Sequence, residues 1–386
     1  MKPSQVAIVG GGVMGASVAW HLAARGVRDV VVLDRSAGPG QGSTGRATGG
    51  FRAQYATAIN VRLSLLARAK LLRFREEVGA DPGYVQAGYL WLAATERELV
   101  LLRGGLELQH AEGLLEAAEV SIADVARLNP AACLDGVMGG AFCPTDGFIR
   151  PLSILEGYAA AARRLGVRVE WGAEVTGVER RGERVTAVKT SGDRIAVEAV
   201  VNAAGPWAPQ VARMAGVELP VTPLRRQVAA TVPCDLLPAG MPMTIWAGDG
   251  YHLRVRDGRV LLLWPTPGVP GQPYEASVDQ EWVAAVVAKT EVRVPVLRGV
   301  PIDPAACWAG LYEMSPDKHA ILGRAPGCDN FYLINGSSGH GVMHAPALGQ
   351  LLAEIITEGK ASTIDASALR PERFVEGAPN PVSELL

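Results

Sequence analysis

The chain has 386 residues, of which 48% are hydrophobic and 20% charged, and its formal net charge is -2. This composition is typical of a globular protein large enough for two domains, and it gives no electrostatic reason to expect a nucleic-acid partner. The five cysteines are scattered and no run of ~18 apolar residues occurs, so we expect a cytoplasmic protein without a disulfide framework, a metal site or a membrane span.

Residues 6–35 predict a strand, a helix and a second strand around a glycine-rich turn. Gly10, Gly12 and Gly15 have the spacing G-x-G-x-x-G, and the second apolar run ends in Asp34. Gly10 permits a tight turn, Gly12 lets a pyrophosphate approach the backbone, and Gly15 lets helix and strand pack closely. Asp34 can accept hydrogen bonds from a ribose diol. These features favour a dinucleotide site over an ordinary turn, without separating NAD from FAD.

The remaining elements follow from periodicity and turn residues. A glycine-rich loop occupies 38–50, and helices are expected at 59–78, 96–119, 151–165 and 345–357. Ser121 is a plausible helix N-cap, with Asp124 three residues later. Strands are expected at 85–93, 167–171, 175–180, 185–190, 195–200, 200–205, 227–232, 243–246, 251–255, 260–264 and 331–335. The strands between 220 and 304 alternate with prolines and turns, which favours a mainly antiparallel sheet.

Five motifs occur in order along the chain: GGGVMGASVAWHLAARG, GSTGRATGGFR, VVNAAGPWA, WAGLYEMSPDKHAILG and NGSSGHGVMHAPALG. Together they resemble the D-amino-acid-oxidase-type (DAO) family of FAD enzymes. The resemblance is greatest to the sarcosine oxidase branch, with its β-subunit-like and proline dehydrogenase-like relatives. The first motif is generic, whereas the last two in this order are specific.

The resemblance implies an α/β (α+β) fold with a Rossmann-type FAD-binding domain and a second, mainly antiparallel-sheet substrate domain. Because nucleotide-binding motifs lie at both ends of the chain, the FAD-binding domain is expected to be discontinuous. It would comprise 1–85, 148–218 and 321–370. The substrate domain would comprise 86–147, 219–320 and 371–386.

The same resemblance implies which residues bind the cofactor. The ADP half and its surroundings would contact Gly10, Gly12, Val13, Met14, Gly15, Asp34 and Arg35, with Val175 at the adenine. The pyrophosphate and flavin would follow Ser43, Thr44, Thr48, Gly49 and Gly50, with Gly205 and Trp207 covering the cofactor. Gly339, His340, Gly341, Val342 and Met343 would form a closing loop whose N–H groups stabilise negative charge on the reduced flavin.

Five residues are candidates for the substrate side of the flavin: Arg52, Tyr251, Tyr312, His340 and Met343. Arg52 would bind a substrate carboxylate, since a guanidinium can do so bidentately. Tyr251 and Tyr312 would confine the substrate. Arg52 could instead be a surface arginine, each tyrosine could be a core residue, and His340 could be only a hydrogen-bonding loop residue.

Three positions depart from the family pattern. Gly310 stands where monomeric sarcosine oxidase attaches its flavin to a cysteine, and Cys307 lies three residues earlier, so we expect non-covalent FAD. Met343 replaces a lysine that helps to bind the carboxylate. The strand at 260–264 lacks a lysine associated with oxygen activation, so we expect oxygen to reoxidise the flavin more slowly than in relatives that carry this lysine.

The expected activity is oxidative demethylation of sarcosine or a similar small secondary amino acid. Hydride transfer to flavin and imine hydrolysis would give glycine and formaldehyde, with hydrogen peroxide when oxygen is the acceptor. The alternatives are L-proline or D-amino-acid dehydrogenation, a nicotinamide-dependent dehydrogenase, and a flavoprotein subunit of a larger complex. The chain would act as a monomer or within such a complex.

Overall fold

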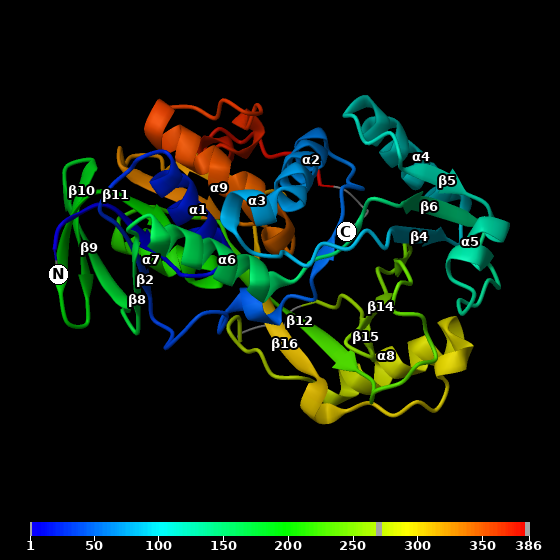
Figure 1. Cartoon of the computed structure of the whole chain (residues 1–386). Helices are drawn as coiled ribbons and strands as arrows, with labels where there is room; N and C mark the ends of the chain where they lie inside the picture. Colours follow the sequence, from blue (N-terminus) through cyan, green and yellow to red (C-terminus); the bar gives the residue numbers. More distant parts are fainter. Residues whose placement is uncertain (1, 268–271, 383–386) are drawn as a thin grey trace.

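The computed structural model describes residues 2–267 and 272–382. Within them, two eight-stranded sheets form the frame of the molecule (Figure 1). The first sheet has the order β17-β18-β11-β1-β2-β8, and β10 and β9 continue from β11. Its strands are β1 Ser4–Val9, β2 Val30–Asp34, β8 Arg168–Trp171, β9 Val175–Arg181, β10 Arg184–Thr190, β11 Arg194–Asn202, β17 Ile321–Arg324 and β18 Phe331–Asn335.

The centre of the first sheet is parallel, because β1 pairs in parallel with β2 and β11, and these pair in parallel with β8 and β18. Three helices pack together on this sheet (Figure 1): α1 Val13–Ala24, α6 Pro151–Arg164 and α9 Gly341–Glu358. Helix α1 is buried on nearly every side, as expected for an apolar helix held between two others. Helix α2 Ala58–Leu72 packs on α9, α3 Phe74–Val78 packs on α6, and α7 Ala208–Met214 packs on β9.

The second sheet has the order β16-β12-β15-β14-β13-β4-β6-β5 and is antiparallel except where β13 meets β4. Its strands are β4 Tyr89–Ala93, β5 Ala118–Val120, β6 Gly139–Cys143, β12 Thr222–Ala230, β13 Met243–Trp246, β14 His252–Arg256, β15 Arg259–Leu263 and β16 Trp308–Met314. Helices α4 Glu96–Ala111, α5 Ile122–Leu128 and α8 Gln280–Arg293 accompany it. A short pair, β3 Gly50–Phe51 with β7 Gly147–Phe148, completes the strands of the described chain.

The expected fold class is confirmed by a parallel sheet covered by helices and a mainly antiparallel second sheet. The expected N-cap at Ser121 is also confirmed, and it is part of a capping box, since Ser121 and Asp124 each accept a hydrogen bond from the other's backbone N–H. The domain boundaries stay a prediction. None of the helices within the described ranges has the length and apolar character needed to cross a membrane.

Several expected elements are wrong in extent, and the largest differences are the following. The helix expected at 59–78 breaks at Arg73, and this break turns Phe74 into the core against Tyr158, with ring centroids 4.8 Å apart. The helix expected at 96–119 stops at Ala111, after which Gly113 adopts a left-handed conformation and the chain continues into β5. The segments expected as separate strands at 195–200 and 200–205 form one strand, β11, which ends at Asn202.

Candidate active site

A cavity of about 460 Å³ is lined by residues of both sheets and of the loops between them. The carboxyl ends of the parallel strands β1, β2 and β11 meet at its first end, which is where α/β sheets bind ligands. We call this the nucleotide end. Strands of the second sheet line the other part, which we call the distal end and which comprises Arg52, Tyr89, Arg226, Met243, Ile245, His252, Leu263 and Tyr312.

The glycine-rich turn between β1 and α1 forms a backbone cradle at the nucleotide end. A Cβ on Gly10 would lie 2.3 Å from the carbonyl oxygen of Ala203, and one on Gly15 would lie 1.9 Å from that of Gly10. Gly12 differs, because a Cβ there would meet only Thr44 Oγ1 at 3.3 Å and would otherwise project into the cavity. The Val13 N–H donates to Thr44 Oγ1 at 3.1 Å. Gly12 caps α1 without a side-chain bond, so the next N–H groups of the helix, those of Met14 and Gly15, are available to an anion.

Asp34 ends β2 with its carboxylate held in place. Oδ2 accepts a hydrogen bond from the Gly11 N–H at 2.6 Å, and Oδ1 accepts one from Ser36 at 2.7 Å. The remaining lone pairs can accept from a ribose diol. The Arg35 guanidinium lies 4.1 Å from the centroid of the Trp207 ring, and Val175 and Gly205 complete this end.

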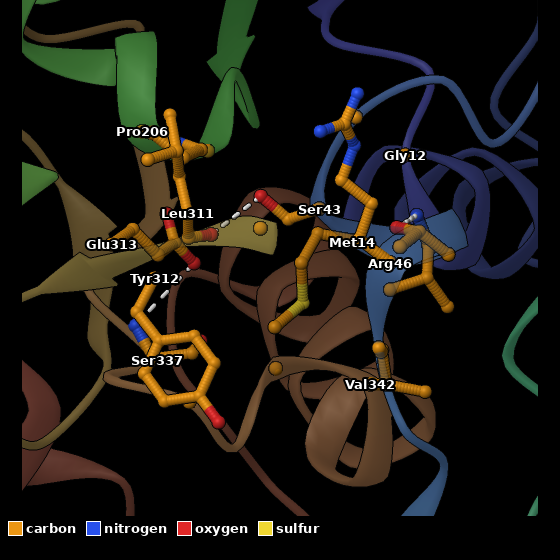
Figure 2. Close-up of a pocket in the computed structure, with 18 of the residues that line it drawn as sticks. Gly12, Met14, Ser43, Arg46, Pro206, Leu311, Tyr312, Glu313, Ser337 and Val342 are labelled. Carbon is orange, nitrogen blue, oxygen red and sulfur yellow. Dashed lines mark hydrogen bonds between the residues drawn. The ribbon is translucent and has the colours of Figure 1, made fainter. Parts of the chain in front are cut away.

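The glycine-rich loop joins the nucleotide end to the distal end. Ser43 donates to the carbonyl of Leu311 at 2.7 Å (Figure 2). Arg46 donates to the carbonyl of Ala309 at 2.9 Å. These bonds fix the loop against β16. A Cβ on Gly49 would lie 2.3 Å from the Ile149 carbonyl oxygen, so this position requires glycine. Thr44, Thr48 and Gly50 also line this part of the cavity.

The N-terminus of α9 faces the cavity from the closing loop. Gly339, His340, Gly341, Val342 and Met343 all line the cavity. His340 caps the helix without a side-chain bond, which leaves the first N–H groups of α9 available to negative charge. Burial, and then the charge of Arg52, hold the pKa of His340 well below its ordinary value. The ring is therefore neutral at physiological pH, and its low basicity makes it a poor general base.

Arg52 projects from the segment after β3 into the distal end and is only 6% exposed. Its guanidinium lies 4.3 Å from the Tyr55 ring centroid and 5.2 Å from that of Trp91, and it donates to Nε2 of His340 at 3.4 Å. The buried carboxylate of Asp146 accepts from the two N–H groups that follow, of Ala53 at 2.7 Å and Gln54 at 3.4 Å. Asp146 therefore positions the backbone that carries Arg52.

Tyr251 does not belong to the cavity, so the expectation that it confines a substrate is wrong. Its side chain is fully buried in the core of the second sheet, and its hydroxyl bonds Thr290 Oγ1 at 2.8 Å. The next residue, His252, lines the cavity instead, because successive side chains of a strand point to opposite faces. His252 donates from Nδ1 to the Gly250 carbonyl at 2.8 Å, which leaves Nε2 as an acceptor.

Tyr312 and Met343 both line the distal part of the cavity. Tyr312 remains 37% exposed and is drawn at the cavity wall in Figure 2. Gly339 allows its approach, since a Cβ there would lie 2.4 Å from the Tyr312 ring. Met343 Sδ accepts a hydrogen bond from the Tyr55 hydroxyl at 3.1 Å, so this side chain is part of the packed wall.

Sequence reasoning missed several polar residues of the cavity, among them Arg226, His252 and Lys318. Only the alternation of side chains along β12 and β14 could have indicated the first two, and that signal requires the strand register.

Every expected cofactor contact lines the cavity except Gly15, which packs against the Gly10 backbone. Gly310 lines the cavity and Cys307 does not, and the thiol of Cys307 accepts from the Ala230 N–H at 3.4 Å.

Comparison with known proteins identifies the family. The model of the DAO family, described as FAD dependent oxidoreductase, matches residues 5–355. Mitochondrial dimethylglycine dehydrogenase of Rattus norvegicus is 29% identical over 395 residues, covering 96% of this chain and 45% of that protein. Mitochondrial sarcosine dehydrogenase of Mus musculus is 28% identical over 380 residues, covering 92% of this chain and 40% of that protein. The chain thus spans less than half the length of these two relatives.

A solved structure resembles the whole chain. The L-proline dehydrogenase from P. horikoshii superposes with a TM-score of 0.91 at 28% identity, and the match covers 98% of this chain and 100% of that one. The cavity fits FAD, because it offers a glycine cradle at α1, a fixed carboxylate at Asp34 and a second helix N-terminus at α9. The chain belongs to the DAO family of FAD-dependent oxidoreductases, and FAD is its cofactor.

Proposed function

We propose that the chain oxidises a small secondary α-amino acid, with sarcosine as the leading candidate. The observation that carries the proposal is the buried Arg52 guanidinium at the distal end, close to the N-terminus of α9. When bound, FAD supplies the hydride acceptor for a carbon–hydrogen bond next to an amine. Similarity to enzymes named for dimethylglycine and sarcosine supports an N-methylated substrate.

Arg52 binds the substrate carboxylate in this proposal. A buried guanidinium and a carboxylate form charge-assisted hydrogen bonds, which are shorter and stronger than those between neutral groups. Aromatic rings of Tyr55 and Trp91 flank the guanidinium and Asp146 holds its backbone, so it is oriented before the substrate arrives. Orientation in advance reduces the entropy lost on binding.

His252 accepts a hydrogen bond from the substrate amine. Its Nδ1–H is occupied by the Gly250 carbonyl, and burial lowers the pKa of His252 to about 4, so Nε2 carries a lone pair at neutral pH. The amine must be neutral for a hydride to leave the adjacent carbon. Burial of the amine near Arg52 and Arg226 favours the neutral form, since desolvation and positive charge both lower the pKa of an amine.

Apolar side chains exclude water around the reacting carbon. Met243, Ile245 and Leu263 line the distal end from β13 and β15. For sarcosine the product is an imine, which water hydrolyses to glycine and formaldehyde. The final electron acceptor is oxygen or another oxidant. We propose that the cofactor is held without a covalent bond, because Gly310 offers no thiol at the cavity wall.

L-Proline dehydrogenation is the second candidate. It is favoured by the likeness to L-proline dehydrogenase, which extends over that entire chain. Proline is also a secondary amine with an α-carboxylate, so Arg52 and His252 would have the same roles. The two candidates differ in product, because the cyclic imine formed from proline releases no formaldehyde.

A panel of amines tests both candidates. The purified chain, saturated with FAD, is assayed with sarcosine, dimethylglycine, L-proline, D-alanine and glycine, using oxygen and an artificial dye as acceptors. We expect turnover of a secondary or tertiary amine with formaldehyde released from the N-methyl substrates. Turnover of proline alone would favour the second candidate, and turnover of primary D-amino acids alone would contradict both.

A further inference from the structure

Strand β12 presents a second guanidinium to the distal end of the cavity. In the antiparallel pairing with β16, Arg226 lies opposite Gly310 and Leu224 opposite Tyr312, so Arg226 shares a face with Tyr312. Its guanidinium carbon lies 5.6 Å from the centroid of the Tyr312 ring. Arg225, the adjacent residue, points to the other face and donates to the Ser277 carbonyl outside the cavity.

The hydrogen bonds of Arg226 leave it without a counter-ion. Nη1 donates to the carbonyl of Thr266 at 2.5 Å and to that of Arg225 at 3.3 Å. Within the described ranges, Nε and Nη2 donate to no protein group, and no carboxylate lies within 4.0 Å of the guanidinium. A guanidinium that is largely removed from water and has no acidic partner is stabilised by an anionic ligand.

The charge of the distal end also favours an anion. The acids that line the described part of the cavity are Asp34, Glu174 and Glu313, and the first two lie at the nucleotide end. Burial raises the pKa of Glu313 to about 7, so it offers only part of a negative charge. Among its described residues, the distal end itself contains two cations, Arg52 and Arg226.

The charges of Arg52 and Arg226 both influence the pKa values of Tyr312 and His252. Although the Tyr312 side chain is 37% exposed, desolvation inside the cavity raises its pKa, and the charges of Arg226 and Arg52 oppose this rise. The same two charges add to burial in lowering the pKa of His252. A substrate with one carboxylate, bound at Arg52, would leave Arg226 without a counter-ion.

We propose that the substrate is a secondary amino acid with a second carboxylate, bound by its α-carboxylate at Arg52 and by the second carboxylate at Arg226. This inference rests on the proposed function. It narrows the substrate from secondary α-amino acids in general to N-alkylated acidic amino acids, so sarcosine, which has only one carboxylate, becomes the weaker substrate. The bond changes stay the same, since the carbon next to nitrogen loses a hydride and water hydrolyses the imine. The second carboxylate takes part only in binding.

Binding of unreactive acids tests the site without turnover. FAD-saturated, oxidised protein is titrated with glutarate and with valerate, which have the same chain length, and the visible spectrum of the cofactor reports binding. We expect glutarate to bind roughly 10- to 100-fold more tightly, the range for one charge-assisted contact. Arg226→Leu should abolish this preference and Arg226→Lys should retain part of it. The matched control Arg225→Leu should leave it unchanged.

Equal affinity for the two acids, or a preference that survives Arg226→Leu, would overturn the inference. If Arg226→Leu fails to fold, Arg226→Gln repeats the test. Kinetics separate this inference from the proposed function: N-methyl-L-aspartate should exceed sarcosine in kcat/KM by a similar factor. Equal use of both substrates would refute the acidic substrate and leave amine oxidation standing. Glutarate binding through Arg226 without oxidation of any amine would refute amine oxidation.

Discussion

The neighbours Tyr251 and His252 face opposite sides of one sheet. A substitution at Tyr251 should therefore change stability, and a substitution at His252 should change catalysis. Tyr251→Phe removes one buried hydrogen bond, the 2.8 Å bond to Thr290 Oγ1. Thr290 keeps its bond to the Val286 carbonyl at 2.7 Å, so no buried donor loses its partner. The cost is therefore about 1 kcal/mol. Given the unfolding entropy of a chain this long, this lowers Tm by roughly 1 °C.

His252→Asn changes a side chain that lines the cavity. The Asn side-chain NH₂ can keep the bond to the Gly250 carbonyl that Nδ1 now makes, so Tm should change little. The Nε2 acceptor is lost, and with it one hydrogen bond to the substrate amine. We expect kcat/KM to fall by ~2- to 10-fold, the equivalent of one net hydrogen bond.

Both variants are assayed as FAD-saturated protein, by thermal unfolding and by steady-state kinetics. Tyr251→Phe should affect unfolding alone, and His252→Asn should affect kinetics alone. If Tyr251→Phe lowered kcat/KM as much as His252→Asn while Tm stayed constant, the assignment of the two faces would be wrong.

Three further predictions concern the cofactor and pH. Gly12→Val should give colourless protein, because a side chain there would project into the cavity at the turn expected to hold the pyrophosphate; full FAD content by absorbance would contradict this. Acid precipitation should leave the yellow colour in the supernatant, since Gly310 offers no thiol, and colour in the pellet would point to a covalent bond. Burial raises the pKa of Asp146 from 3.8 to about 7, so the folded state holds an extra proton between these values. The free energy of unfolding should therefore fall as pH rises through this window, by at most ~1.4 kcal/mol per pH unit. Asp146→Asn should remove this part of the slope, and parallel pH profiles for both proteins would refute the assignment.

The nucleotide end could be predicted because its constraints are local in sequence. Gly10 and Gly15 are required by backbone approaches within one strand–turn–helix unit, and Asp34 follows at the end of the next strand. These requirements leave a spacing that can be recognised without knowing the rest of the fold.

The distal end could not be predicted in the same way. Whether Tyr251 or His252 faces the cavity depends on the register of β14 with distant strands, and a shift of one residue exchanges the two faces. Arg226 joins the site only through the pairing of β12 with β16, some eighty residues away along the chain. The break at Arg73 likewise has no glycine or proline to mark it and serves the packing of Phe74.

The most direct test of the proposed chemistry is anaerobic mixing of the FAD-saturated chain with secondary amino acids, followed by the visible absorbance of the cofactor. The wild-type protein should lose its colour on mixing. Arg52→Met should retain full FAD and require at least ~30-fold more substrate, the equivalent of 2 kcal/mol or more for truncating one partner of a buried charge pair. Colour that persists with every secondary amino acid, or an Arg52→Met variant that responds like the wild type, would contradict the account.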